Sequence, residues 1–222
     1  MEDPPGSGAG SKSDQAPANE LELALVARSQ RGDVAAFNSL VERYQGLAYA
    51  LALRMLGDPD TAADVTQDAF FSAFRAIQSF RGASFRAWLL RIVSNACFDI
   101  FRARGRQPSS SLDELLDSET AGDAATPAAL IDSSWDPERA ILRAEVIAAI
   151  QGALLQLPDD QRLAVILSDV QGLPSDEIAR IMDSPLGTVK SRIARARGHL
   201  RDLLARQPEL FPRRERQHSS EE

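Results

Sequence analysis

The chain has very little cysteine or histidine. Among its 222 residues there are one cysteine, Cys97, and two histidines, His199 and His218. One cysteine excludes an internal disulfide framework, and these three residues show none of the spacings of a zinc site. We therefore expect no metal and no other cofactor, and a reducing, cytoplasmic setting, where disulfides are rare. Cys97 is predicted to be a small buried apolar residue.

Long apolar segments are also missing. No run of about 18 uncharged apolar residues is present to span a bilayer. The first twenty residues, MEDPPGSGAGSKSDQAPANE, lack the apolar segment of a signal peptide. We expect a soluble protein with no membrane insertion.

The alternation of β-branched and polar residues that marks strands is nowhere long. Helical periodicity is instead nearly continuous from 20 to 106, and it returns from 137 to about 206. Turn signals such as GDPD and LPDD divide each stretch into about four helices. The sequence thus predicts an all-α protein with two small helical domains, at 19–107 and 137–206.

Three further segments differ from these domains in composition. Residues 1–18 are rich in Gly, Pro, Ser and Ala, and we expect them to be disordered. Residues 108–136 contain seven acidic residues but no Lys or Arg, which predicts a flexible acidic linker. Residues 207–222 are polar and are predicted to form a disordered tail.

Positive charge is concentrated near the C-terminus, although the formal net charge of the whole chain is -7. Between Thr188 and Leu204, apolar side chains fall on one helical face, which predicts inward packing. The opposite face is small in its middle and basic at its borders, so it can approach DNA closely. It comprises Ser191, Ala194, Arg195 and Gly198, flanked by Lys190, Arg192, Arg197 and Arg201.

A short predicted helix, Asp176 to Met182, precedes this basic helix after a tight connection. This is the spacing of a helix-turn-helix, whose second helix enters the major groove while cationic side chains at its borders reach phosphates. The alternative is a pair of packed helices with a solvated basic face.

The helix predicted from Asp60 to Phe80 also has two distinct faces. Its inward face is apolar. Its outward face carries Phe71 among polar residues, as interfaces often do; the alternative is that Phe71 packs under the first helix. The outward set is Asp64, Gln67, Asp68, Phe71 and Arg75.

The stretch GLPSDEIARIMDSPLGTVKSRIARARGHLR resembles the C-terminal helix-turn-helix of the extracytoplasmic-function (ECF) group of bacterial sigma factors. The matching positions include Pro185, Gly187 and the Thr188-Val189-Lys190-Ser191-Arg192 run. Asp183 replaces the usual turn glycine. Because aspartate enters the left-handed region more readily than most residues, we expect the turn to persist.

The first domain is independently similar to the same group. The stretch DPDTAADVTQDAFFSAFRAIQSFRGASFRAWLLRIVSNACFDIFR resembles its conserved region two, although Ala63 replaces a usual glutamate. The resemblance implies that the outward face of the first helix in this stretch binds core RNA polymerase. It also implies that the turn from Phe80 to Ser84 captures a base of the promoter minus-ten element.

The resemblance gives three sets of candidate residues. Besides the polymerase-binding set above, it implies a minus-ten DNA-binding set of Arg81, Ser84, Phe85, Arg86, Arg91, Asn95 and Arg102. The minus-thirty-five DNA-binding set is Thr188, Lys190, Ser191, Arg192, Ala194, Arg195, Arg197 and Gly198. Trp88 is assigned to the core by its helical phase. The implied partners are core RNA polymerase, promoter DNA and an anti-sigma factor, and the chain is expected not to be an enzyme.

Three other classes are less consistent with the residues. A response-regulator-like DNA-binding protein needs a receiver domain, but residues 20–106 show no alternating strands. A helical metal-dependent hydrolase would need Asp60, Asp64, Asp68 and Asp99 to converge, yet no histidine lies near them. An RNA-binding module would need an aromatic sheet or a GXXG loop.

Overall fold

The computed structural model describes residues 15–82, 84–106 and 137–211. The predicted acidic linker at 108–136 lies outside these residues, as do residues 1–14 and 212–222. Helix α1 begins at Gln15, four residues before the expected boundary of the first domain, and residues 207–211 continue from the last helix as turns. The described residues are helical or in turns, which confirms the all-α prediction.

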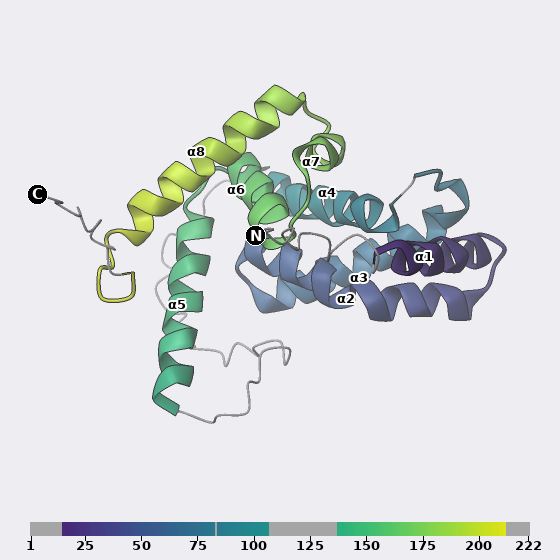
Figure 1. The fold of residues 1–222 in the computed structure, drawn as a ribbon, viewed down its shortest axis with the longest axis horizontal. Coiled ribbons are helices and arrows are strands. Elements are labelled where there is room, and N and C mark those ends of the chain that lie inside the picture. The colour runs from purple at the N-terminus through teal and green to yellow at the C-terminus, as the bar shows by residue number, and fades with distance from the viewer. Residues whose placement is uncertain (1–14, 83, 107–136, 212–222) are drawn as a thin grey trace, which may run out of the picture.

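The helices of the first unit pack side by side as a bundle (Figure 1). Asp33 begins the second helix by accepting a hydrogen bond from the Ala36 N–H at 3.0 Å, and Asp58 begins the third by accepting one from Thr61 N–H at 2.8 Å. Gly57 ends the second helix in the left-handed region, at φ 77°. The elements are α1 (Gln15–Gln30), α2 (Val34–Leu56), α3 (Pro59–Ala76), the short 3-10 turn η1 (Ile77–Ser79) and α4 (Phe85–Arg106).

The second unit contains four more helices. The third and fourth of them meet at a tight turn in which Asp183 has φ 47°, so aspartate does occupy the left-handed position expected of it. The elements are α5 (Pro137–Leu155), α6 (Asp159–Val165) with its π-helical continuation η3 (Ile166–Val170), α7 (Ser175–Ile181) and α8 (Leu186–Leu204).

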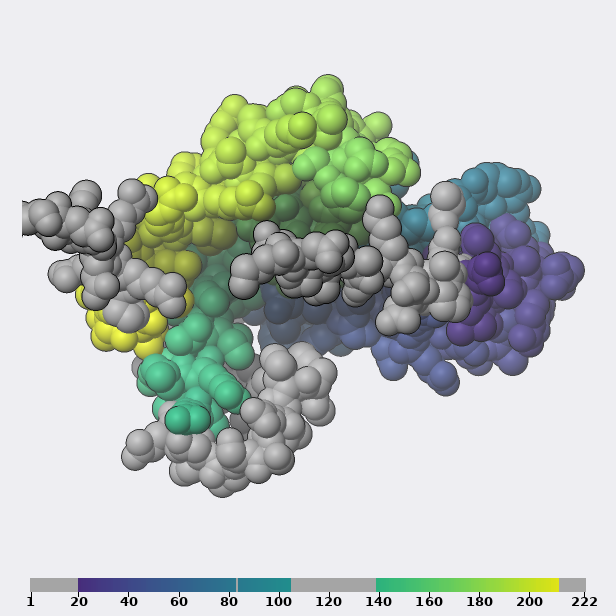
Figure 2. All heavy atoms as spheres, in the orientation of Figure 1, coloured from purple at the N-terminus to yellow at the C-terminus, as the bar shows by residue number. Residues whose placement is uncertain are grey.

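The two units pack directly against each other. Helix α2 contacts α5 and α6, and α4 contacts α7. In the space-filling view, green atoms of the second unit lie against teal atoms of α4 (Figure 2). Buried apolar side chains from both units form one continuous cluster. The units are therefore closed on each other, an arrangement that the sequence pattern did not specify.

One buried cation crosses the boundary between the units. Arg162 on α6 is 6% exposed, and its guanidinium donates to the Met55 carbonyl of α2 at 2.7 Å. The same group donates to the carbonyls of Leu154, Leu155 and Leu157 at 2.8 to 2.9 Å. Met55 and Leu155 lie at the C-terminal ends of α2 and α5, where carbonyls lack partners within the helix, and Leu157 follows α5. The Leu154 carbonyl also accepts the Leu157 N–H, at 3.1 Å. One side chain thus satisfies backbone acceptors of both units.

Replacing Arg162 with methionine is expected to lower the free energy of unfolding by at least about 2 kcal/mol, because it leaves several buried carbonyls without donors. Lysine at this position should recover only part of the loss, since it lacks the planar fork of five donors. Denaturant unfolding measures both effects. Arg143→Met on the exposed face of α5 is the matched control, and a comparable loss there would contradict the assignment.

Candidate functional site

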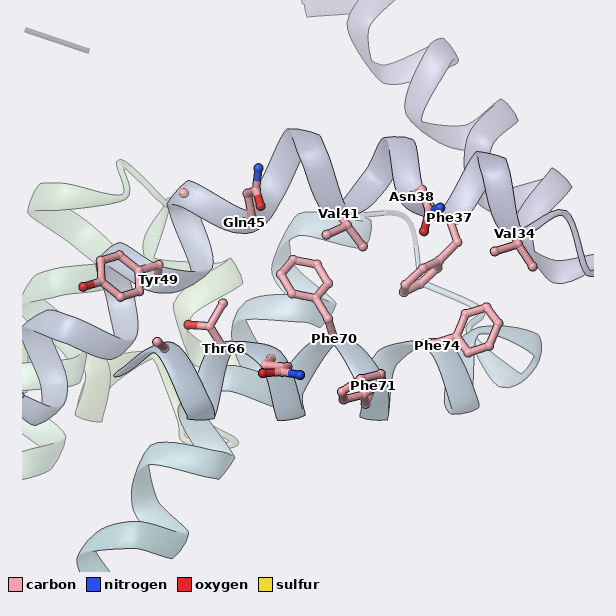
Figure 3. A pocket seen from close by; sticks show the side chains of 13 residues that line it. Val34, Phe37, Asn38, Val41, Gln45, Tyr49, Thr66, Phe70, Phe71 and Phe74 are labelled. Carbon is pink, nitrogen blue, oxygen red and sulfur yellow. The ribbon is translucent and has the colours of Figure 1, made fainter. Parts of the chain in front are cut away.

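A groove of about 770 Å³ runs between α2 and α3. Figure 3 shows Phe70 and Phe37 between the two helices, with Phe71 and Phe74 further along α3. The groove exposes apolar surface: Val34, Phe71 and Phe74 are 55%, 53% and 44% exposed. Large exposed apolar side chains gathered in one hollow are typical of a protein-binding surface.

All five residues of the predicted polymerase-binding set lie exposed on α3, and two of them, Gln67 and Phe71, line this groove. Phe71 does not pack under the first helix, which was the alternative. Sequence reasoning missed Phe74 and the α2 side of the groove. Phe74 lies three residues after Phe71 on the same helical face, and this spacing is the sequence signal by which it could have been found. The α2 residues of the lining are Val34, Phe37, Asn38, Val41, Gln45, Gly46 and Tyr49.

The turn after η1 is held in a defined shape. Arg81 is exposed, and its guanidinium donates to the carbonyls of Gln78 and Phe80 at 2.7 and 2.9 Å. Ser84 begins α4, because its hydroxyl oxygen accepts a hydrogen bond from the Ala87 N–H at 3.1 Å. Of the predicted minus-ten residues in the turn, Arg81 is therefore exposed and Ser84 is half-buried. Ala83, which the turn also contains, is outside the described residues.

Phe85 differs from the expectation. It is 1% exposed, so its ring packs in the core and does not face solvent. The ring lies 5.6 Å from those of both Tyr44 and Trp88, and Phe80 lies 4.9 Å from Trp88. The physical reason is helical phase, because Phe85 shares the inward face of α4 with Leu89. Trp88 packs against the core, as predicted.

The remaining minus-ten candidates on α4 divide into two groups. Arg91, Asn95 and Arg102 are exposed, and Arg102 pairs with Asp99 one turn away. Arg86 instead donates to the Gln171 carbonyl of the second unit, and its Nε is buried without a hydrogen bond. In the closed arrangement, Arg86 is therefore part of the boundary between the units.

Helix α8 places the predicted basic face on the outside. Val189, Ile193 and Ala196 are buried as expected, and Lys190, Ala194 and Arg195 are exposed. Thr188 and Arg197 are also exposed, while Ser191, Arg192 and Gly198 are half-buried. The whole predicted set thus lies on one accessible face, the geometry that a recognition helix requires.

Two of these cations are engaged by acidic residues of the same unit. Arg192 pairs with Asp160 at 2.6 Å, and Arg197 makes a bidentate pair with Asp169, at 2.6 and 3.0 Å. The hydrogen bonds from Arg197 hold the pKa of the Asp169 carboxyl below its usual range. Lys190 and Arg195 form no ion pair with any described residue. These two cations are the ones most readily available to phosphates.

Other kinds of site find little support in the described part of the chain. There, no three His, Cys, Asp or Glu side chains come together to hold a metal ion. Burial raises the pKa of the Cys97 thiol to about 12, and its side chain is fully buried, as predicted. Among the same residues, no helix combines the length and apolar character needed to cross a membrane.

Both parts of the chain match known family models. The Sigma-70 region 2 model covers residues 40–107, and the Sigma-70, region 4 model covers residues 147–200. The matched ranges fall within the two units, the first with the groove and the turn, the second with the helix-turn-helix. The fold and its surfaces thus define a sigma factor of the sigma-70 class, a transcription initiation factor.

Similar proteins narrow this class. The chain is 43% identical over 180 residues to the RNA polymerase sigma-H factor of Pseudomonas aeruginosa, covering 80% of this chain and 91% of the relative. It is 42% identical over 174 residues to the ECF RNA polymerase sigma-E factor of Escherichia coli K12, covering 78% and 88%. The chain belongs to the ECF sigma factors. It is therefore a protein that binds core RNA polymerase and directs it to promoters.

Two solved structures share the fold across most of the chain. CnrH, in complex with the cytosolic domain of CnrY, has a TM-score of 0.59 at 28% identity and covers 84% of this chain and 98% of its own. The sigma factor RpoE of Bartonella quintana, in complex with the anti-sigma factor NepR, has a TM-score of 0.57 at 30% identity and covers 76% and 96%.

Asp169 pairs with Arg197, a member of the predicted minus-thirty-five set, and we expect it to compete with DNA phosphates for that cation. Asp169→Asn is therefore expected to tighten binding of the polymerase-bound chain to promoter DNA. The gain should be about two- to fivefold, the range of an exposed ion pair. Competition binding at fixed salt measures it. Glu145→Gln removes one negative charge from α5 and is the matched control; an equal gain there would show a general charge effect instead.

Proposed function

We propose that the three surfaces divide the work of initiation among them. The groove between α2 and α3 binds core RNA polymerase, with Asp64, Gln67, Asp68, Phe71 and Arg75 around it. The turn after η1 and the outer stripe of α4 recognise and help to melt the minus-ten element. The outer face of α8 enters the major groove at the minus-thirty-five element. The residues that carry these tasks are the three sets named above, apart from the buried Phe85.

The observation that carries the polymerase assignment is the aromatic groove itself. Phe71 and Phe74 remain about half exposed, and the ring of Phe74 lies 5.0 Å from that of Phe37 at the groove wall. Exposed aromatic anchors beside charged residues supply most of the binding energy at many interfaces. A rod-shaped partner such as a helix or a coiled coil fits an elongated groove between two helices.

The promoter assignments rest on exposure and shape. Gly198 lies inside α8, where glycine costs about 1 kcal/mol relative to alanine. A Cβ at Gly198 would meet no atom within 4 Å, so packing within the chain does not require a glycine there. Close approach of an external backbone supplies a reason for it. Arg195, one turn before it, is exposed and has no acidic partner among the described residues.

The closed arrangement must open for promoter binding. Two promoter elements a little over two helical turns apart are separated by roughly 70 Å, using about 35 Å per turn. Units in direct contact do not span that distance. In addition, Arg86 becomes available to DNA only when its contact with the Gln171 carbonyl breaks.

A closed form of this kind is a natural target for regulation. CnrH and RpoE, the two fold neighbours described above, were solved in complex with CnrY and with the anti-sigma factor NepR. By this similarity, an anti-sigma factor holds the present chain inactive until a stress signal releases it. The protein acts in the cytoplasm, where core polymerase is, and it catalyses no reaction of its own.

Phe71→Ala is expected to weaken binding of core polymerase about tenfold or more, because it removes the most exposed aromatic ring of the groove. Fluorescence anisotropy of labelled chain titrated with core enzyme measures the affinity. Ile141→Ala removes a side chain that is 62% exposed on α5 and is the matched control. Equal losses for both variants would contradict a specific anchor.

Arg195→Ala is expected to leave polymerase affinity unchanged and to reduce initiation about five- to twentyfold on promoters that depend on the upstream element. In vitro transcription across a promoter library measures the reduction and identifies the preferred sequence. Arg143→Ala on α5 serves as the control for loss of one exposed cation. Loss of polymerase binding in the Arg195 variant would overturn the division of labour.

A further inference from the structure

Helix α1 lies outside the range that matches the region 2 family model, which begins at residue 40. It nevertheless packs along α2 and contacts both η1 and α4, the two elements that flank the turn proposed to capture a minus-ten base. Two polar side chains of α1 reach these flanking elements. Their partners are backbone groups, which position a turn more directly than side-chain contacts do.

Gln30, the last residue of α1, holds the first end of the turn. Its side-chain amide donates to the Ile77 carbonyl at 3.1 Å and to the Phe80 carbonyl at 2.8 Å. These carbonyls belong to the start of η1 and to the residue that follows it. The amide therefore fixes the point at which the chain leaves η1 and enters the turn.

Glu22 holds the second end of the turn, where α4 begins. Its side chain is among the few buried charged groups, at 7% exposed. One carboxylate oxygen accepts the Phe85 N–H at 3.0 Å, and the other accepts the Tyr44 hydroxyl. Phe85 is the first residue of α4, where a carboxylate is favoured by the helix dipole and by the unpaired N–H groups.

The Tyr44 hydroxyl keeps this carboxylate satisfied. Burial, together with its hydrogen bond to Glu22, raises the pKa of Tyr44 to about 12, so the phenol stays protonated and continues to donate. A buried carboxylate without such partners would be costly. The Glu22 carboxylate is thus held in place by the Tyr44 hydroxyl of α2 as well as by the Phe85 N–H of α4.

The spacing of the two residues explains how one helix holds both ends. Glu22 and Gln30 are eight positions apart, a little over two helical turns, and their side chains leave α1 about 80° apart around its axis. Along the helix axis they are separated by about 12 Å. A rigid rod of that length sets the distance between the two ends of the turn.

We propose that Glu22 and Gln30 are positioning residues for minus-ten recognition, which act by fixing both ends of the turn and without touching DNA. The proposal rests on the proposed role of the turn in base capture. A turn free at either end would sample more conformations. It would then distinguish the correct base from others less well, while the groove on α2 and α3 would be unaffected.

The test uses the full chain bound to core polymerase. Open-complex formation is measured on a promoter and on variants with single base changes in the minus-ten element. Gln30→Ala and Glu22→Ala are each expected to reduce the preference for the correct base about fivefold, the effect of roughly one net hydrogen bond. Polymerase affinity should be unchanged. Glu22→Gln keeps an acceptor oxygen for the Phe85 N–H and should restore part of the preference.

Two controls separate positioning from stability. Gln156→Ala removes an exposed amide just after α5, whose one hydrogen bond among the described residues goes to the Gly152 carbonyl of that helix, and it should keep full preference. Arg162→Met, which is expected to lower stability, should lower the melting temperature yet keep the preference, because the bonds of Glu22 and Gln30 to the two ends of the turn remain. If Arg162→Met loses preference in proportion to its loss of stability, and the α1 variants fall on the same line, the positioning role is overturned.

A further pair of variants distinguishes this proposal from the one it rests on. Arg81→Ala and Ser84→Ala change the turn itself. If they alter base preference while Gln30→Ala and Glu22→Ala do not, α1 has no positioning role and the turn still captures the base. If neither pair alters base preference, base capture by the turn is wrong, and the role of α1 falls with it.

Discussion

The need to satisfy backbone groups at helix ends organises this molecule. The ends of the helices in the described residues leave many N–H and carbonyl groups without partners inside a helix, and burying such groups unpaired is costly. The side chains that meet this need across elements include Arg162 at the ends of α2 and α5, Gln30 after η1, and Glu22 at the start of α4. The closure of the two units and the shape of the proposed base-capturing turn both depend on these bonds.

Charged residues are distributed unevenly along the chain, and some of them pair within the second unit. A chain with net charge -7 presents a basic face on α8, the proposed recognition helix, because its acidic residues are mostly elsewhere in the sequence. Within the second unit, however, Asp160 and Asp169 pair with Arg192 and Arg197 at the border of that helix. The pairs orient long side chains before DNA arrives and lower the local positive charge. This favours weak DNA binding by the free chain, since phosphate contacts dominate affinity.

Much of the site was predictable from residue spacing. The inward faces of α3 and α8 follow from a period of 3.6 residues, and the exposure of Phe71 follows from its place opposite Ala69 and Ala73. The burial of Phe85 follows from the same rule, although its position beside the turn favoured a DNA contact. The groove was only half predicted, because its second wall comes from α2 and no local pattern indicates which faces of two helices will meet.

By itself, the sequence determined the helices, their buried faces, the left-handed turn at Asp183 and the basic face of α8, because each depends on neighbours within a few residues. Only the tertiary structure decided that the two units close on each other, that Arg86 donates to the Gln171 carbonyl, and that α1 reaches both ends of the turn. These are contacts between residues 47 to 107 positions apart. Such contacts depend on how whole helices pack. The spacing of apolar residues indicates which face of a helix is buried, but it does not indicate which other helix packs on that face.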